Sequence, residues 1–344
     1  MTESRVLSQP SHEATIVEHG IRSLLPPNVE VRSGPGCPVC VTSPDEIDAA
    51  VELSQRARTV VTTFGDMLRV PSSTCSLAEI NAKGGNVRVV YSIHDAVSLA
   101  KEDPDREFVH FAIGFETTAP TTASELLHDC PSNFSVICSH RLIPPAMEHL
   151  LTMGEIKING FICPGHVSTI IGSEAYQAMS EKYKVPQVIA GFEPIDVLIA
   201  IAMIITQVNN GEANVQNEYT RSVRASGNVK AKEAMAEAFD IRDADWRGIG
   251  TIKASAFRLK EKLSQYDALK KFGLEPKATY KVPSGCRCGD VLRGLIYPEQ
   301  CPLFNKVCTP TRPVGPCAVS REGACYISMR TSKNRAETPL ERST

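Results

Sequence analysis

No segment of this chain is apolar over the length that a membrane-spanning helix needs. Its most apolar stretch, Val197–Ile205, has nine residues and fits a buried helix better. The first thirty residues contain no apolar core of a secretory signal, because Ser, Glu, His and Pro interrupt each apolar run. We therefore expect a cytoplasmic protein without membrane contact.

A strong excess of charge of either sign is also absent. The formal net charge is −2 and the pI is near 6.5, so the sequence offers no electrostatic footprint for nucleic acid or an anionic membrane. With 42% hydrophobic and 22% charged residues, the composition is that of an ordinary soluble globular protein. A length of 344 residues allows two or three domains.

Two common families of catalytic motif are missing. Gly84-Gly85 lacks the lysine and serine of a phosphate-binding loop, and no G-x-G-x-x-G follows a predicted strand. No G-x-S-x-G elbow of a serine hydrolase is present either. The sequence therefore gives no support for nucleotide binding or for serine hydrolase chemistry.

Short β-rich runs alternate with helical patterns from about residue 28 to residue 208. This alternation predicts an α/β fold of two similar domains with mainly parallel sheets, followed by a C-terminal cysteine-rich domain. We place the domains at residues 1–92, 93–210 and 211–344. The predicted strands are Val29–Val31, Thr59–Thr62, Val87–Tyr91, Phe108–Ile113, Phe134–Cys138, Gly160–Cys163 and Gln187–Ala190.

A weak internal repeat favours the idea of two similar halves. Pro35-Gly36-Cys37 is echoed by Pro164-Gly165-His166, and Phe64-Gly65-Asp66 is echoed by Phe192-Glu193-Pro194. Coincidence in any chain of alternating strands and helices explains these echoes equally well.

Cysteine is abundant, and half of the twelve cysteines lie between Cys286 and Cys325. This segment has many prolines and glycines and little apolar periodicity, so something other than an apolar core must hold it. Without an export signal, clustered cysteines indicate metal binding or redox chemistry more than structural disulfides. No histidine lies in the segment, which predicts an all-thiolate site for zinc or an iron–sulfur cluster. Which four of the six cysteines act as ligands stays open.

A second cysteine motif lies near the N-terminus, in Gly34-Pro35-Gly36-Cys37-Pro38-Val39-Cys40. Two thiols at this spacing can form a disulfide or share one metal. The loop precedes a predicted helix N-terminus, whose positive potential favours the thiolate form. We therefore interpret Cys37 and Cys40 as a redox dithiol, with two unreactive packed side chains as the alternative.

Polar residues also gather in loops after other predicted strands. At the carboxyl ends of parallel strands such loops line the ligand crevice. Helix capping or bonding to loop amides is the alternative role for each residue. The candidates are Asp66, Glu116, His166 and Glu193.

These motifs together resemble one family, that of the hydrogenase maturation protein HypD. The resemblance extends from about residue 12 to residue 330, in order. It rests on residues 34–42, 63–71, 114–120, 164–168, 191–196, 246–250 and 287–325.

The resemblance implies a scaffold for assembling the Fe(CN)2CO moiety of [NiFe]-hydrogenases, rather than a conventional turnover enzyme. It implies an iron-bridged complex with the small chaperone HypC, delivery of cyanide by HypE, and attachment of CO. It further implies that Cys37 and Cys40 are the catalytic dithiol and that a [4Fe–4S] cluster feeds them electrons. By match to the family pattern, the cluster ligands are expected to be Cys288, Cys301, Cys308 and Cys325.

The chain departs from the family near its start. The Cys-Gly-Gly-His-Thr-His string of the family falls, by register, on residues 9–14. Only His12 matches; Gln9 stands at the cysteine and Ala14 at the second histidine. His12 therefore joins Asp66, Glu116, His166 and Glu193 as a candidate for the iron site.

Two other functions fit the same residues. An iron–sulfur thiol–disulfide oxidoreductase would reduce a separate protein partner and would need no HypC. A metal-stabilised binding module would keep its function after both Cys37 and Cys40 were replaced.

Overall fold

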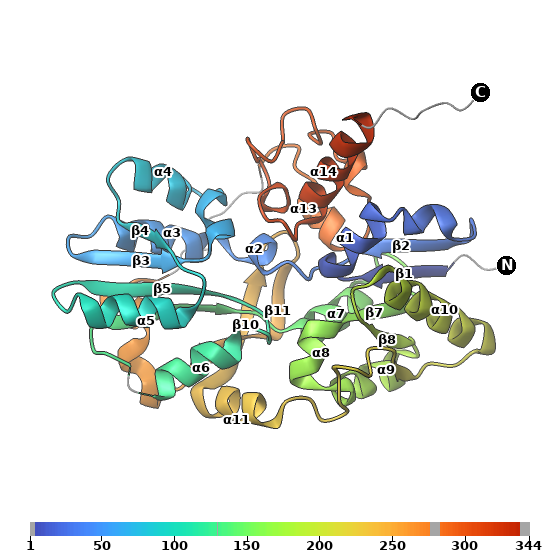
Figure 1. The fold of residues 1–344 in the computed structure, drawn as a ribbon, viewed down its shortest axis with the longest axis horizontal. Coiled ribbons are helices and arrows are strands. Elements are labelled where there is room, and N and C mark those ends of the chain that lie inside the picture. Colours follow the sequence, from blue (N-terminus) through green and yellow to red (C-terminus); the bar gives the residue numbers. More distant parts are fainter. Residues whose placement is uncertain (1–3, 129, 276–282, 338–344) are drawn as a thin grey trace.

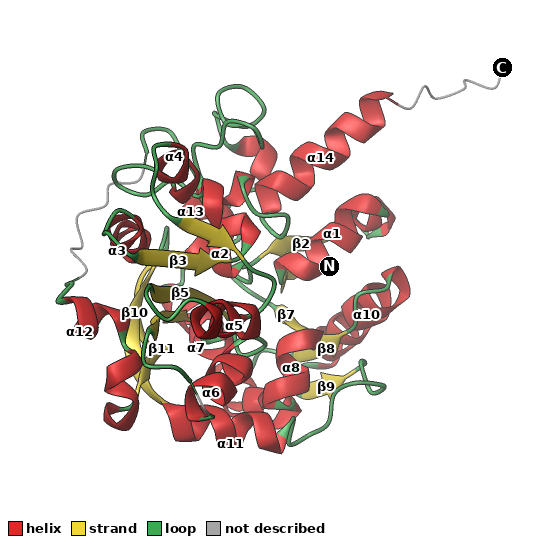
Figure 2. Cartoon of the chain, turned by 60° about the vertical axis from the view of Figure 1, so that its left-hand side comes forward, coloured by secondary structure: helices red, strands yellow, loops and turns green. Residues whose placement is uncertain are grey.

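The computed structural model describes residues 4–128, 130–275 and 283–337. Two parallel sheets lie side by side, and helices cover both of them (Figures 1 and 2). A cysteine-rich tail from residue 283 packs across the place where the two sheets meet (Figure 1). The predicted α/β class with parallel sheets and a cysteine-rich C-terminal region is confirmed.

Sheet A has five strands, and every neighbouring pair is parallel. Its strands come from two distant parts of the chain, because β1 pairs with both β2 and β7. In spatial order they are β2 (Val29–Ser33), β1 (Ser4–Ser8), β7 (Gly160–Pro164), β8 (Gln187–Ala190) and β9 (Val215–Asn217).

Sheet B has four strands, also all parallel, from the intervening part of the chain. The boundaries predicted at residues 92 and 210 are therefore not where the sheets divide. The echoed tripeptides starting at Pro35 and Pro164 both lie at the ends of strands of sheet A, whereas those starting at Phe64 and Phe192 follow a strand of sheet B and a strand of sheet A. In spatial order the strands are β4 (Val87–Val89), β3 (Thr59–Thr63), β5 (Glu107–Gly114) and β6 (Phe134–His140).

All strands predicted from the β-rich runs are present. Helices connect them, as parallel pairing requires. The α-helices are α1 (Pro10–Glu18), α2 (Pro38–Val41), α3 (Pro44–Ser54), α4 (Leu77–Ala82), α5 (Ile93–Glu102), α6 (Ala119–Leu127), α7 (Ile143–Met153), α8 (Gly165–Ile171), α9 (Gln177–Tyr183), α10 (Pro194–Asn210), α11 (Val229–Ala238), α12 (Ala268–Phe272), α13 (Cys288–Leu292) and α14 (Ala324–Glu337). The 3-10 turns are η1 (Ile21–Leu24), η2 (Gly65–Arg69), η3 (Ser173–Tyr176), η4 (Glu261–Tyr266), η5 (Pro298–Gln300) and η6 (Pro316–Ala318).

Because successive side chains of a strand point to opposite faces of the sheet, neighbouring apolar residues pack into different cores. Val6 faces α1 and α10, whereas its neighbour Leu7 faces the central core. The central core also takes Val61 and Phe111 from sheet B and the tail cysteines, so it joins both sheets to the tail. No helix in the described parts of the chain is long and apolar enough to cross a membrane.

An antiparallel hairpin, β10 (Phe239–Trp246) and β11 (Gly250–Leu259), reaches from sheet B toward the tail (Figure 1). Phe115 stacks on Trp246 near the hairpin tip, with ring centroids 6.0 Å apart. The Trp246 indole N–H donates to Ser255 Oγ at 2.9 Å, which satisfies its polar atom inside the core. The tip is therefore held in one position.

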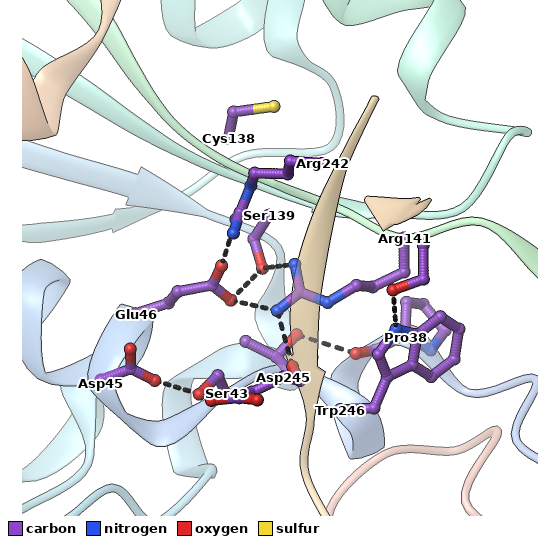
Figure 3. Close-up of polar contacts among 12 residues, drawn as sticks. Pro38, Ser43, Asp45, Glu46, Cys138, Ser139, Arg141, Arg242, Asp245 and Trp246 are labelled. Carbon is purple, nitrogen blue, oxygen red and sulfur yellow. Dashed lines mark hydrogen bonds and ion pairs between the residues drawn. The ribbon is translucent and has the colours of Figure 1, made fainter. Parts of the chain in front are cut away.

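A buried ion pair fastens this hairpin and α3 to sheet B (Figure 3). Glu46 accepts from Arg141 at 2.7 Å, from Arg242 at 3.0 Å and from the Ser139 hydroxyl at 2.6 Å. Burial on its own would raise the pKa of the Glu46 carboxyl, but Arg141 and then Arg242 hold it below its usual value. Removing one member of such a group leaves an uncompensated buried charge.

Glu46→Gln should therefore destabilise the fold by about 3 kcal/mol at neutral pH, measured by urea unfolding. A carboxylate with a lowered folded-state pKa stabilises above its unfolded pKa, and this contribution is lost as the pH falls through the folded value. The difference between the two proteins should therefore shrink on acidification. Glu52→Gln, on the same helix but 56% exposed, is the control and should change stability by less than about 0.5 kcal/mol. Equal effects of the two substitutions would contradict this role for Glu46.

Candidate dithiol and metal centre

The Cys37-x-x-Cys40 motif forms a short turn of helix directly after sheet A. Cys37 caps α2, and its Sγ accepts from the Cys40 N–H at 3.2 Å. The two cysteines form a disulfide, and both side chains are fully buried. Gly34 lets β2 approach β1 here, since a Cβ at this position would lie 3.0 Å from the Ser8 carbonyl oxygen.

All six tail cysteines line a single cavity at the centre of the tail. The remaining lining is apolar or glycine, so no histidine or carboxylate competes with sulfur. The lining residues are Cys286, Cys288, Cys301, Leu303, Phe304, Cys308, Gly315, Cys317, Ala318, Cys325 and Met329.

Two of these cysteines are joined to each other. Cys288 forms a disulfide with Cys317, which takes it out of the set of free thiols. Cys286, which the expected ligand set omitted, is a free thiol on the same cavity. The free thiols of the cavity are thus Cys286, Cys301, Cys308 and Cys325, with Cys286 in place of the expected Cys288.

The four free thiols influence one another electrostatically. Burial raises the pKa of the Cys325 thiol well above its usual value, and Cys308, Cys301 and Cys286 raise it further. Four thiolates would repel each other here unless a cationic inorganic group lay between them. The donor set therefore fits a cysteine-ligated iron–sulfur cluster or zinc.

The positions of the four thiols distinguish between an iron–sulfur cluster and a zinc ion. Across the described ranges, no three His, Cys, Asp or Glu side chains are grouped closely enough to hold one metal ion. Zinc needs all four sulfurs about 2.3 Å from a single point. Thiols spread round a cavity suit a group of several atoms better.

The dithiol and the tail cysteines are neighbours. Cys40 Sγ lies 3.9 Å from the carbonyl oxygen of Pro316, the residue before Cys317. The tip of the hairpin spans the same junction: the Arg247 N–H donates to the Val41 carbonyl at 3.0 Å, and Gly248 touches Gly289. A Cβ on Gly289 would lie 2.2 Å from the Gly248 oxygen, so only glycine permits this backbone crossing. The Cys288–Cys317 bond thus lies between the dithiol and the four free thiols.

Three of the candidate iron ligands lie at the carboxyl edge of sheet A. The rings of His12 and His166 lie 5.2 Å and 4.0 Å from the ring of Phe192, and Glu193 follows it on the surface. His12 is fully buried, with Nε2 3.3 Å from the Ala190 oxygen and no partner at Nδ1 among the described residues. Burial lowers the pKa of His12 to about 4, so its ring is neutral at pH 7.

The neutral ring of His12 is therefore suited to metal binding. If Nε2 carries the proton and donates to Ala190, the lone pair of Nδ1 is free.

The other two candidates have partners of their own. Asp66 Oδ2 accepts from the Ser320 hydroxyl at 2.9 Å and from the Arg321 N–H at 3.1 Å, so it docks the tail on the loop after β3. Glu116 is buried and accepts from the Ile143 N–H at 2.9 Å. Burial raises the pKa of Glu116 to about 7. Both residues therefore have the loop-bonding role named as the alternative.

The family pattern left Cys286 out of the expected ligand set, and the sequence indicated neither the role of Pro316 nor the pairing of Cys288 with Cys317. The cysteine count carried a partial signal, because six thiols exceed the four that one site needs. Pairings among six cysteines cannot be deduced from sequence alone. The contact of Pro316 with Cys40 joins positions 276 residues apart and left no sequence signal.

Comparisons with known proteins agree on one family. The family profile described as "HypD: Hydrogenase formation hypA family" matches residues 10–332. A protein of Methanocaldococcus jannaschii named for hydrogenase expression and formation is 51% identical over 92% of this chain and 88% of its own length. The hydrogenase maturation factors HypD of Rhizobium leguminosarum and Azotobacter vinelandii are 46% and 45% identical, over 91% of this chain and 84% and 85% of theirs.

Proposed function

Because this chain belongs to the HypD family of hydrogenase maturation factors, we propose that it is the scaffold on which the Fe(CN)2CO moiety of [NiFe]-hydrogenase is assembled. In this proposal HypC is the partner that shares the iron, and HypE donates the cyanide. The observation that carries the proposal is the contact between a dithiol and a sulfur-lined cavity. Cys40 Sγ lies 3.9 Å from the Pro316 oxygen, beside Cys317.

The dithiol is the group that changes oxidation state. A [4Fe–4S] cluster, when bound by Cys286, Cys301, Cys308 and Cys325, supplies electrons one at a time. The Cys288–Cys317 bond must first be opened to two thiols, which takes two protons from solvent and two electrons of the kind that a bound cluster would supply. The Cys317 thiolate then attacks the Cys37–Cys40 bond at Cys40, and Cys288 closes on Cys317. One S–S bond breaks, another forms, and two thiols appear at Cys37 and Cys40. The exchange therefore balances without an added oxidant.

The iron that receives CN and CO is cargo rather than a resident cofactor. The reduced thiols of Cys37 and Cys40 are soft donors that would hold it. His12 supports the proposal through its neutral ring and through an Nδ1 that has no partner among the described residues, and His166 lies against the same Phe192 ring. Glu193 adds an exposed carboxylate beside them. Asp66 and Glu116 are less suited, because tail and loop amides engage them.

Burial of the dithiol argues against a general oxidoreductase acting on protein disulfides. Both sulfurs are inaccessible in the oxidised protein, and thiol–disulfide exchange requires in-line access to a sulfur. A scaffold whose dithiol is reduced from inside the same chain does not need a partner protein to reach the two sulfurs. The buried dithiol therefore favours assembly on the protein itself.

The assignment of Cys286, and not Cys288, as a cluster ligand predicts opposite effects of replacing these two cysteines, which are separated only by Arg287. After anaerobic reconstitution, Cys286→Ser should lose most cluster iron and acid-labile sulfide, since serine is a poor replacement for a soft thiolate. Cys288→Ser combined with Cys317→Ser should retain both, because neither sulfur is a ligand. The reverse pattern would restore the ligand set first expected from the family pattern.

The scaffold role is tested on the complex with HypC, purified anaerobically from cells that also make HypE. Infrared spectra should show bands of bound CN and CO, with iron retained by the complex. Replacing both Cys37 and Cys40 by Ser should abolish the bands while leaving cluster iron in the tail. Bands that survive this double substitution would refute the role of the dithiol, and the Cys75→Ser protein is the control for a cysteine outside both sites.

A further inference from the structure

The cysteines of the tail differ in how close they lie to the surface. Cys317, beside the dithiol, is 1% exposed, whereas Cys286 and Cys301 are half-buried. Cys308 is itself buried, but its neighbour Val307 is 57% exposed. The cavity therefore has an inner side toward the dithiol and an outer side that approaches solvent at Cys301 and Val307.

Two tight turns frame Cys308 on this outer side. In the first turn, the Lys306 N–H donates to the Leu303 carbonyl at 3.2 Å. In the second turn, the Arg312 N–H donates to the Thr309 carbonyl at 3.1 Å. Both basic side chains are exposed. Backbone bonds thus hold one basic side chain on each side of Cys308 along the chain.

A third cation reaches the same turns from sheet B. Arg69, in η2 after β3, is exposed, and its Nη1 donates to the Pro310 carbonyl at 2.9 Å. Among the described residues, no carboxylate forms an ion pair with Arg69, Lys306 or Arg312. These three cations and Val307 together are called the basic turn surface below.

The positive charge of this surface is local. The whole chain has a formal net charge of −2, yet residues 300–321 contain three basic residues and no aspartate or glutamate. Arg321 is not counted in the surface, because Asp66 accepts from its N–H and Glu322 follows it in the chain. A local excess of one sign attracts partners of the opposite charge.

One alternative is that these cations only offset the charge of the thiolates in the cavity. A cation that serves a buried anion lies inside the fold, as the 1%-exposed Arg141 does beside Glu46. Arg69, Lys306 and Arg312 are exposed instead, so water and salt screen most of their effect on the cavity. Their positions suit a charged partner outside the protein better.

We propose that the basic turn surface is the docking site of an acidic one-electron carrier protein that reduces the tail cluster, an inference that rests on the cluster proposed above. Carboxylates of the reduced carrier pair with Arg69, Lys306 and Arg312. The docked carrier gives one electron to the cluster and leaves oxidised by one electron. Two carriers in succession supply the two electrons that a disulfide takes up.

The make-up of the surface fits a brief encounter of this kind. Its cations surround a single exposed apolar side chain, Val307, which directly precedes the cluster ligand Cys308. Contact at Val307 brings the redox group of a carrier close to the cluster. A small charged interface of this type binds weakly, and electrostatic attraction speeds its formation. A carrier that must leave after each electron needs both properties.

The main test measures binding of an oxidised acidic ferredoxin to the reconstituted full-length protein by titration calorimetry. Lys306→Glu combined with Arg312→Glu should weaken binding at least about tenfold at low ionic strength, because two attractive charges become repulsive. In about 1 M salt the difference should fall below about threefold, since salt screens exposed charges. The control is Lys230→Glu combined with Lys232→Glu, the same charge change on α11, at the other end of the molecule from the tail (Figure 1). The control protein should bind within about twofold of the unmodified one.

Equal weakening by the two pairs of substitutions would overturn the proposal, because net charge alone would then explain the binding. Unchanged affinity in the Lys306 and Arg312 variant would overturn it as well. Iron and acid-labile sulfide are measured in every variant and should stay at the level of the unmodified protein. Loss of cluster iron from the Lys306 and Arg312 variant would show that these cations stabilise the cluster itself, which also contradicts a docking role.

A second measurement locates the contact without any substitution. Carbodiimide joins a lysine amine to a carboxylate that pairs with it, so Lys306 should be the main lysine cross-linked to the ferredoxin, as identified by peptide mass spectrometry. Cross-links confined to lysines on other faces, such as Lys230, would contradict the proposal.

The apolar centre of the surface is tested separately. Val307→Ser should weaken ferredoxin binding about threefold at low and at high salt alike, because lost apolar contact is not screened. Val307 is 57% exposed, so this substitution leaves the fold intact. Unchanged affinity would contradict a contact centred beside Cys308.

These binding measurements need no HypC, no HypE and no hydrogenase. A failed docking test would therefore leave the infrared test of the scaffold unaffected. Missing infrared bands would conversely refute the scaffold while the binding results stood.

Discussion

The contact between Cys40 and the Pro316–Cys317 turn is the constraint on which the chemistry of this protein depends. Thiol–disulfide exchange works only between sulfurs that can touch, and the two cysteine regions lie far apart in the sequence. Three elements bring them together: α2 presents Cys40, the hairpin tip bonds to α2 and crosses the tail at Gly248, and Asp66 docks Ser320. The two disulfides consequently lie next to each other.

The tail is held by specific contacts more than by regular structure. It joins the central core through several cysteines and through buried apolar side chains, among them Val291 and Met329. Arg22 and Arg32 lie over the Tyr297 ring, at 5.2 Å and 4.2 Å from its centroid, and add cation–π attraction. Apolar burial and these cation–π contacts together fix the position of the tail. The tail cysteines are therefore held in place beside the dithiol.

The sequence predicts the strands well where they are buried on both faces. Runs such as Thr59–Thr62 and Phe108–Ile113 are continuous and rich in β-branched or aromatic residues, which parallel strands require. It does not predict β1, whose Ser4–Ser8 segment contains an arginine and two serines, although β1 pairs on both sides. The hairpin also escaped prediction, because β10 carries charges on its exposed face. Pairing between residues distant in sequence also explains why sheet A crosses the predicted boundaries.

Contacts between residues distant in sequence also limit how much of the site can be predicted. Residue types at short spacing identified the dithiol and the sulfur-rich tail, since that chemistry is visible in single motifs. The pairing of Cys288 with Cys317, and the different partners of His12 and Asp66, depend on which loops the fold brings together. Gln9, at the position of the family cysteine, follows β1 and lies beside Gly34. The departure from the family therefore falls next to the dithiol loop.

The adjacency of Cys40 and Cys317 can be measured directly. In a protein with Cys37→Ser and Cys288→Ser, these two cysteines lose their present partners. Mild oxidation of the folded protein should join Cys40 to Cys317 in most molecules, and peptide mass spectrometry would identify the bond. If Cys40 and Cys317 instead remain free or are capped separately by the oxidant, the two regions are not in contact in solution. The thiol–disulfide exchange between tail and dithiol would then be wrong.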